Sequence, residues 1–148
     1  MSSDTPTWII DRWAQRMANE CPLQQVVHAG ITLRVCRRPL ELPGKRVYGA
    51  WDPQLRRIEL FGCDASRSDT QLVETLLHEL WHVLADARRK TRHPRRRATS
   101  TYAADEAAAR RFTQAWIRQL KRKTIRRCAG ALRAQAVEGP PGAVVGQR

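Results

Sequence analysis

The segment H-E-L-W-H at residues 78–82 constrains the fold of this chain more than any other part of its sequence. It has the pattern H-E-x-x-H, and on a helix this spacing places His78 and His82 one turn apart on the same face. Two imidazole nitrogens in that arrangement can bind one metal ion at about 2.0–2.1 Å each. Glu79 is rotated next to that face, where its carboxylate can take a proton from a water on the metal without being a ligand. The segment therefore predicts a helix that carries two metal ligands and a catalytic base.

The residues around this segment favour a helix with one apolar side. Ser68 and Gln71 fit a capping box, and Asp69 places a negative charge at the positive end of the helix. We expect the helix to run from Ser68 to about Arg88. Its apolar residues recur at helical spacing: Leu72, Leu76, Leu80 and Val83. The other side carries polar residues, including Thr75, and is expected to face a cleft.

A zinc site of a peptidase requires a third protein ligand and leaves one position for water. The remaining histidines are poor candidates, because His28 lies well upstream and His93 lies among arginines that repel a cation. Asp105 and Glu106 begin the next expected helix, and the small alanines at 107–109 allow it to pack closely on the motif helix. We interpret Glu106 as the third ligand of a Zn²⁺ ion. Asp105 is the alternative, either as the ligand itself or as a hydrogen-bond acceptor that orients a ligand imidazole.

Four short runs before the motif helix have the composition of strands. Residues 26–28 and 31–35 are rich in β-branched side chains. Residues 47–51 and 57–61 flank a turn signal at residues 52–54, where a proline fixes φ at the first corner. The second pair of runs predicts a hairpin, and together the four runs predict a sheet of three or four strands.

Helical signals lie at both ends of the chain. We expect a first helix over residues 7–19 and a long helix from Tyr102 to about Arg127. These elements predict a small sheet and three helices, of which the last carries the candidate third ligand. At 148 residues the chain has the length of one domain. We assign residues 1–135 to that domain and expect residues 136–148 to form a disordered tail.

The charge of the chain is unevenly distributed. Residues 1–87 carry 10 Lys and Arg against 11 Asp and Glu, a net charge of −1, whereas residues 88–148 carry 17 against 3, a net charge of +14; together these give the +13 of the whole chain. A positive field of this strength favours anionic partners, nucleic acid above all. Residues 88–127 therefore make nucleic acid a candidate partner, in addition to a protein substrate.

Nothing in the sequence indicates a membrane span or export. No apolar run approaches the length of about 18 residues that a membrane helix requires. Residues 1–6 are polar and are not followed by the long apolar stretch of a signal peptide. None of the four cysteines lies in a C-x-x-C pair, which argues against a zinc ribbon and favours buried thiols that stay reduced. We therefore expect a cytoplasmic protein.

Three segments, taken in order, resemble the ImmA/IrrE family of metallo-endopeptidases. The first is the predicted hairpin, with residues 48–53 and 57–60. The second is the motif segment at residues 75–82, which is typical of zincins in general. The third is residues 105–112, where an acidic pair precedes alanines, arginines and a phenylalanine. The resemblance covers about residues 25–118.

This resemblance implies a compact α+β zincin with a short sheet over the motif helix and a glutamate, here Glu106, as third ligand. It also implies that the strand before the motif helix binds an extended substrate along its edge. Members of the family typically cleave a regulatory protein, often a repressor. The family usually has an E-A-N-like sequence near the third ligand, and this chain has Ala or Arg in place of that asparagine.

Two other classes of protein are alternatives. A SprT-like, DNA-associated protease shares the H-E-x-x-H pattern and would account for the basic half, although its third ligand is usually a histidine. A non-catalytic nucleic-acid-binding protein would contact phosphates through the basic clusters at residues 88–90, 95–97 and 121–127. The classes can be separated, because binding through a basic surface survives chelation and Glu79→Gln, whereas zinc-dependent proteolysis is lost with either.

Overall fold

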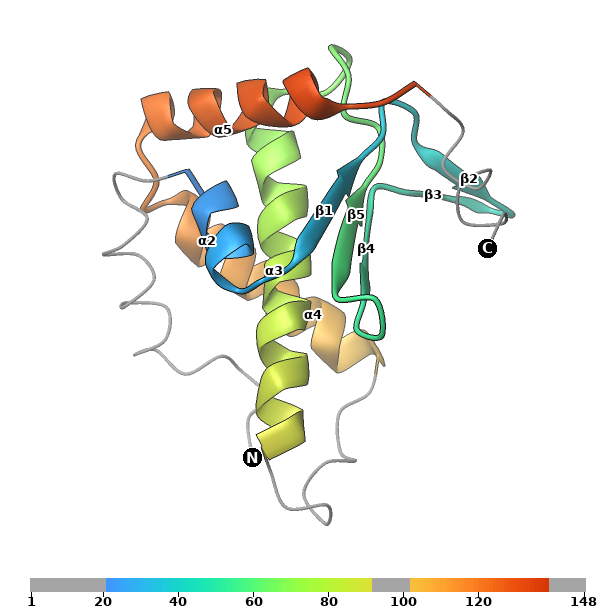
Figure 1. Ribbon diagram of the computed structural model, residues 1–148, viewed down its shortest axis with the longest axis vertical. Helices are drawn as coiled ribbons and strands as arrows, with labels where there is room; N and C mark the ends of the chain where they lie inside the picture. Colours follow the sequence, from blue (N-terminus) through green and yellow to red (C-terminus); the bar gives the residue numbers. More distant parts are fainter. Residues whose placement is uncertain (1–20, 92–101, 139–148) are drawn as a thin grey trace.

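The structure is a computed structural model that describes residues 21–91 and 102–138. The helix expected over residues 7–19, His93, and the chain from residue 139 onward lie outside these residues. The described elements follow in the order α2 (Leu23–His28), β1 (Thr32–Val35), β2 (Leu40–Leu42), β3 (Lys45–Val47), β4 (Gly49–Asp52), β5 (Arg57–Leu60), α3 (Asp69–Thr91), α4 (Tyr102–Ile117) and α5 (Arg122–Gln135) (Figure 1). This is a mixed α+β arrangement, as the sequence predicts.

The sheet has three strands in the order β1-β5-β4. β5 pairs in parallel with β1 and antiparallel with β4, so β5 is central and β4 lies at an edge. The predicted hairpin is confirmed, because β4 and β5 are joined by a turn whose backbone N–H groups at Gln54 and Leu55 donate to Asp52 Oδ1 at 3.0 and 3.2 Å. A second hairpin, β2-β3, was not expected; its signal was Pro43-Gly44, with Gly44 at a φ of 76°.

The interpretation of residues 26–28 as a strand is wrong, because they form the end of helix α2. The backbone N–H of Gly30 donates to the Val27 carbonyl and that of Ile31 to the Val26 carbonyl, at 3.0 and 3.1 Å. With Gly30 at a φ of 67°, these two bonds are the Schellman end of a helix. Gly30 was therefore a helix-terminating signal, and the β-branched pair before it was too short to specify a strand.

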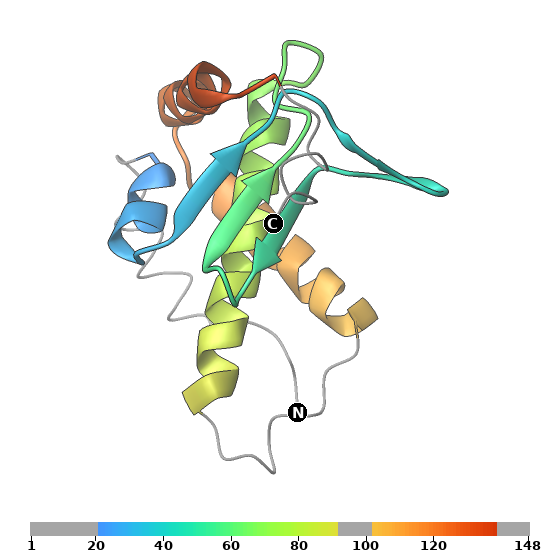
Figure 2. The same ribbon diagram turned by 45° about the vertical axis from the view of Figure 1, so that its right-hand side comes forward.

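Helix α3 is the centre of the molecule. Its predicted capping box is confirmed: the Gln71 backbone N–H donates to Ser68 Oγ at 3.1 Å, and the Ser68 N–H donates to Gln71 Oε1 at 2.9 Å. Of the predicted apolar side, Leu72, Leu76 and Leu80 are buried and Val83 is partly buried. Together with Val73 and Leu77, this side packs against the sheet and the other long helices. The three strands lie over one side of α3, while α4 crosses its other side (Figure 2). One central helix is thus covered on both sides, which builds a single core.

The long helix expected from Tyr102 to about Arg127 is instead two helices. α4 ends at Ile117, and α5 begins at Arg122 after an extended Lys121. A straight helix over both segments would reach about 50 Å at 1.5 Å per residue, and could not keep both of its apolar stripes on α3. The break turns α5 across the N-terminal end of α3, where Arg133 Nη1 donates to Asp69 Oδ1 at 2.6 Å (Figure 1).

The chain returns to the sheet after α5. Val137 forms a bridge with Cys36, in which its N–H donates to the Val35 carbonyl at 2.9 Å. Cys36, Cys63 and Cys128 are buried in the core, in agreement with their expected role as small apolar side chains. Among the residues that the structure describes, no helix has the length and apolar character needed to span a membrane.

Candidate metal centre

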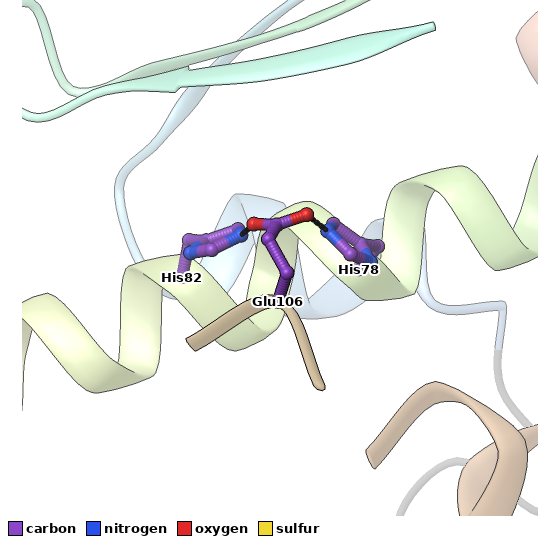
Figure 3. Close-up of side chains that lie close together, drawn as sticks. All are labelled: His78, His82 and Glu106. Carbon is purple, nitrogen blue, oxygen red and sulfur yellow. Dashed lines mark hydrogen bonds and ion pairs between the residues drawn. The ribbon is translucent and has the colours of Figure 1, made fainter. Parts of the chain in front are cut away.

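Three side chains from two helices converge at one point (Figure 3). His78 and His82 project from the same face of α3, and Glu106 reaches between them from α4. His78 Nε2 lies 3.0 Å from Glu106 Oε1, and His82 Nε2 lies 2.9 Å from Glu106 Oε2. One ligand atom from each residue lies within 4.8 Å of the others. Among the described residues, no other group of three His, Cys, Asp or Glu side chains converges in this way.

The donor set and its spacing fit a divalent metal ion. Two imidazole nitrogens and one carboxylate oxygen are ligands that zinc accepts in catalytic sites. In a tetrahedral site with bonds of about 2.0–2.1 Å, neighbouring ligand atoms lie about 3.3 Å apart. The two imidazoles lie at comparable distances, 3.0 and 2.9 Å, from different oxygens of Glu106. The three side chains are 23–24% exposed, so the point where they converge can be reached from solvent.

Burial prepares His82 for metal binding. Burial lowers the pKa of His82, which favours the neutral imidazole, and the nearby carboxylate of Glu106 opposes that effect only in part. A neutral ring has a nitrogen lone pair that can bind a metal. Trp81 is 3% exposed and packs edge-on against the His82 ring, with centroids 5.1 Å apart. Trp81 is thus a core residue that holds the ring of a candidate ligand in place.

Glu79 lies beside this centre and is itself buried, with 6% of its surface exposed. Burial, and then the negative charge of Glu106, raises the pKa of Glu79 to about 8. Edge strand β4 comes close at this point, because a Cβ atom at Gly49 would lie 2.9 Å from both Glu79 Oε2 and Thr75 Cγ2. A glycine therefore allows the strand to approach the helix at the carboxylate. Sequence reasoning missed this role of Gly49, and its only signal was a glycine inside a strand.

A cleft of about 420 Å³ opens in front of these residues. Its sides are formed by the polar face of α3, by α4 from Tyr102 to Gln114, and by the chain from β3 into β4. The lining residues are Lys45, Arg46, Val47, Tyr48, Gly49, Arg67, Gln71, Glu74, Thr75, His78, Glu79, Tyr102, Glu106, Arg110, Thr113 and Gln114. The expectation that the polar side of the motif helix faces a cleft is confirmed by Gln71 and Thr75. Arg67 and Arg110 were not expected there, because nothing local in the sequence places them in the cleft.

The strand that borders the cleft is not the one that the family resemblance implied. β5 directly precedes the motif helix, but it is paired on both sides and has no free edge. β4 lies at the edge of the sheet, and Gly49 at its start lines the cleft. In this hairpin β4 comes first in the chain but lies at the edge of the sheet, and β5 follows it but lies at the centre. Order along the chain therefore does not identify the edge strand.

The remaining sequence candidates lie elsewhere. His28 is exposed at the end of α2 and is not part of the cluster. Asp105 is also outside the cluster. Its negative charge opposes the lowering of the His82 pKa by burial, so it acts on the site from nearby. His93 lies outside the described residues.

Comparison with known proteins finds no match, whether with protein-family models, curated proteins or solved structures. The function is therefore inferred from the arrangement of side chains in the cleft.

Proposed function

We propose that this protein is a zinc-dependent metallo-endopeptidase that hydrolyses peptide bonds of a protein substrate. The observation that carries the proposal is the convergence of His78 Nε2 and His82 Nε2 on the carboxylate of Glu106, 3.0 and 2.9 Å away respectively, with buried Glu79 next to them. A helix with two histidines and an adjacent glutamate is common by chance. A carboxylate from a different helix that contacts both imidazoles is much less common by chance. This contact supports a zincin-like site of two histidines and one glutamate.

Each residue then has a distinct role. When bound, zinc supplies a Lewis acid that polarises a carbonyl group and lowers the pKa of water. His78, His82 and Glu106 would hold the ion, and the carboxylate would balance part of its charge. Glu79 takes a proton from the attacking water and passes it to the leaving amine. Without a metal, burial and the charge of Glu106 raise the pKa of Glu79, and the positive charge of a bound ion would favour the carboxylate form that accepts a proton.

The shape of the cleft supports a peptide as substrate. β4 is an edge strand whose outer backbone groups can pair with an extended chain. It meets α3 at Gly49, next to the carboxylate of Glu79. A peptide added along this edge would pass the metal centre with its backbone held in an extended form. The resemblance to the ImmA/IrrE family adds the proposal that the substrate is a regulatory protein such as a repressor.

Metal analysis of the purified protein tests the site directly. We expect about one zinc per chain, and loss of zinc in His78→Ala and in Glu106→Ala. His28→Ala is the matched control, because it removes an exposed histidine outside the cluster. A protein that holds no zinc after reconstitution would contradict the proposal. Zinc lost with His78→Ala but kept with Glu106→Ala would keep the class of enzyme and make Asp105 or His93 the third ligand.

A second candidate function is nucleic-acid binding, which the surface of α5 favours. This helix has no acidic residue, and Arg122, Lys123, Arg126 and Arg127 are all exposed on it. Phosphate contacts by such side chains give binding that weakens steeply with salt. The test is salt-dependent binding of a DNA duplex by the native protein and by Glu79→Gln, with and without chelator. Binding that survives both changes would assign it to the basic surface, and it is compatible with proteolysis on DNA of the SprT-like kind.

A further inference from the structure

Arg67, in the loop before α3, is held rigidly at the wall of the cleft. Its Nη2 donates to Thr75 Oγ1 at 2.8 Å and to the Gln71 carbonyl at 3.3 Å, and its Nη1 donates to the Phe61 carbonyl at 3.4 Å. Its guanidinium carbon also lies 4.2 Å from the centroid of the Tyr48 ring, stacked on the aromatic face. The position of this cation is therefore defined before any ligand binds.

These contacts leave Arg67 without an ion pair among the described residues, while the charges of Asp64 and Glu74 act on it from beyond ion-pair distance. All of its hydrogen-bond acceptors are neutral oxygens, and among the described residues no carboxylate lies within ion-pair distance of its nitrogens. Burial lowers the pKa of Arg67, as expected for a cation that has lost part of its hydration. The side chain still has donors that these contacts do not use, because a guanidinium carries five N–H groups.

The location of Arg67 relates it to the metal centre. Thr75, which accepts its shortest hydrogen bond, lies three residues before His78 and so on the same face of α3. Thr75 lies about one helix turn from His78, and one turn rises about 5.4 Å. An extended peptide covers that distance in one to two residues, because it advances about 3.3 Å per residue. A substrate residue one or two positions from the cleaved bond would thus lie opposite Arg67.

A second cation faces the same cleft from α4. Arg110 follows Glu106 by four residues, which places it one turn along on the face that carries the candidate ligand. Of the other cations that line the cleft, Arg46 is paired with Glu41 at 2.9 Å, and Lys45 is exposed on β3. Among the described residues that line the cleft, three are acidic: Glu79 and Glu106 at the candidate metal centre, and Glu74 away from it. The cleft is therefore positive next to the metal centre.

We propose that the cleft binds a carboxylate group of its substrate at Arg67, with Arg110 adding positive charge from α4, so that an acidic group beside the cleaved bond is preferred. The planar guanidinium can hold a carboxylate through two parallel hydrogen bonds. This inference rests on the proposed peptidase function and adds the chemical class of the substrate. The carboxylate can come from an Asp or Glu side chain or from the C-terminus of a peptide, and the two sources are separated below.

The test begins with the zinc-loaded protein and a proteome-derived mixture of peptides, whose cleavage sites are identified by mass spectrometry. We expect acidic residues to be enriched at one position close to the cleaved bond. A pair of synthetic peptides with Glu or Gln at that position then gives the preference as a ratio of kcat/KM. We expect a ratio of about ten to a hundred, the usual effect of losing a charge-assisted hydrogen bond.

Variants of the two arginines connect this preference to the cleft. In Arg67→Gln the ratio of kcat/KM for the Glu and Gln peptides should fall close to one, because the substrate carboxylate loses its partner, and the zinc content reports whether the metal centre is intact. Arg67→Lys should keep part of the ratio, because it retains the charge but not the planar geometry. Arg110→Gln, an exposed position, should lower the ratio by about two- to fivefold, and it carries the test if Arg67→Gln does not fold. Arg126→Gln on α5 is the control for loss of one positive charge and should keep the native ratio.

The outcomes separate this inference from the function it rests on. Cleavage of the Glu and Gln peptides at equal rates, with no effect of C-terminal amidation, overturns the inference and leaves the peptidase function standing. Cleavage lost on amidation, but unaffected by Glu or Gln, identifies the C-terminal carboxylate as the group bound. A zinc-loaded protein that cleaves no peptide overturns both.

Discussion

Helices α3 and α4 contribute to the candidate metal centre in different ways. The two histidines of α3 are neighbours because of helical spacing alone, so they would face each other in any context where this segment is helical. Glu106 is 28 residues after His78 and reaches the site only because α4 packs against α3. Ala108 and Ala109 permit that packing, since both are buried and neither holds the helices apart. The comparison shows that two of the candidate ligands depend on local structure and the third on tertiary contacts.

The largest effect is expected from a change that leaves both helices intact. Glu79→Gln removes the proposed proton acceptor from α3 without touching a ligand. We expect kcat to fall by about 10²–10⁴, the usual contribution of a general base, while zinc content stays at the native level. Glu138→Gln, an exposed acid that follows α5 and does not line the cleft, is the control and should keep the native rate. An unchanged kcat in Glu79→Gln would remove this residue from the mechanism.

The pH dependence of stability distinguishes the buried acid of α3 from the ligands. In the metal-free protein, burial raises the pKa of Glu79 from 4.5 to about 8. The folded state therefore favours the protonated form, and this contribution is fully present below pH 4.5 and is lost as pH rises through 8. We expect the loss to be on the order of 2–4 kcal/mol of unfolding free energy. Thermal or urea unfolding of the chelated protein and of Glu79→Gln measures it.

The difference between the two proteins is the informative quantity, because other groups titrate in both. Glu79→Gln should be as stable as the native metal-free protein near pH 4.5 and more stable near pH 9. Parallel curves across that range would mean that the carboxylate is not buried in solution.

The dependence of the third ligand on packing can be broken from the α4 side. Ala109→Leu adds volume at a fully buried position, and we expect it to cost about 1–3 kcal/mol of stability and to weaken zinc binding by moving Glu106. Competition with a chromogenic chelator measures the affinity, and thermal unfolding measures the stability. Ala103→Leu, exposed in the first turn of α4, is the control. If zinc affinity is the same in both variants, Glu106 does not need close packing to reach the ion.

The approach of the edge strand gives the smallest of these effects. Gly49→Ala would place a Cβ atom 2.9 Å from Glu79 Oε2 and from Thr75 Cγ2, so β4 or α3 must shift. We expect a loss of about 1–2 kcal/mol of stability and a lower rate of peptide cleavage. The matched control is Gly130→Ala on α5, where nothing lies within 4 Å, and which should gain about 0.5–1 kcal/mol as a helix position. Equal behaviour of the two variants would show that the contact at Gly49 is absent in solution.

Local patterns in the sequence sufficed for some of these elements. The capping box of Ser68 and Gln71 and the hairpin around Asp52 were predictable, because each depends on residues a few positions apart. The β-branched pair at residues 26 and 27 is typical of a strand, but Gly30 ends a helix at this point, so the local pattern is misleading here. No glycine or proline marks the break between α4 and α5 at Lys121, so the local pattern predicts one continuous helix there.

The amino-acid sequence was enough to place two histidines and a glutamate on one helix and to nominate Glu106 as their partner. Only the tertiary structure decided where α4 ends, which strand borders the cleft, and that Arg67 and Arg110 face the same space as the candidate ligands. The physical reason is the range of the interactions. Helical spacing, caps and turns act over a few residues, whereas helix packing and strand order depend on contacts between segments far apart in the chain.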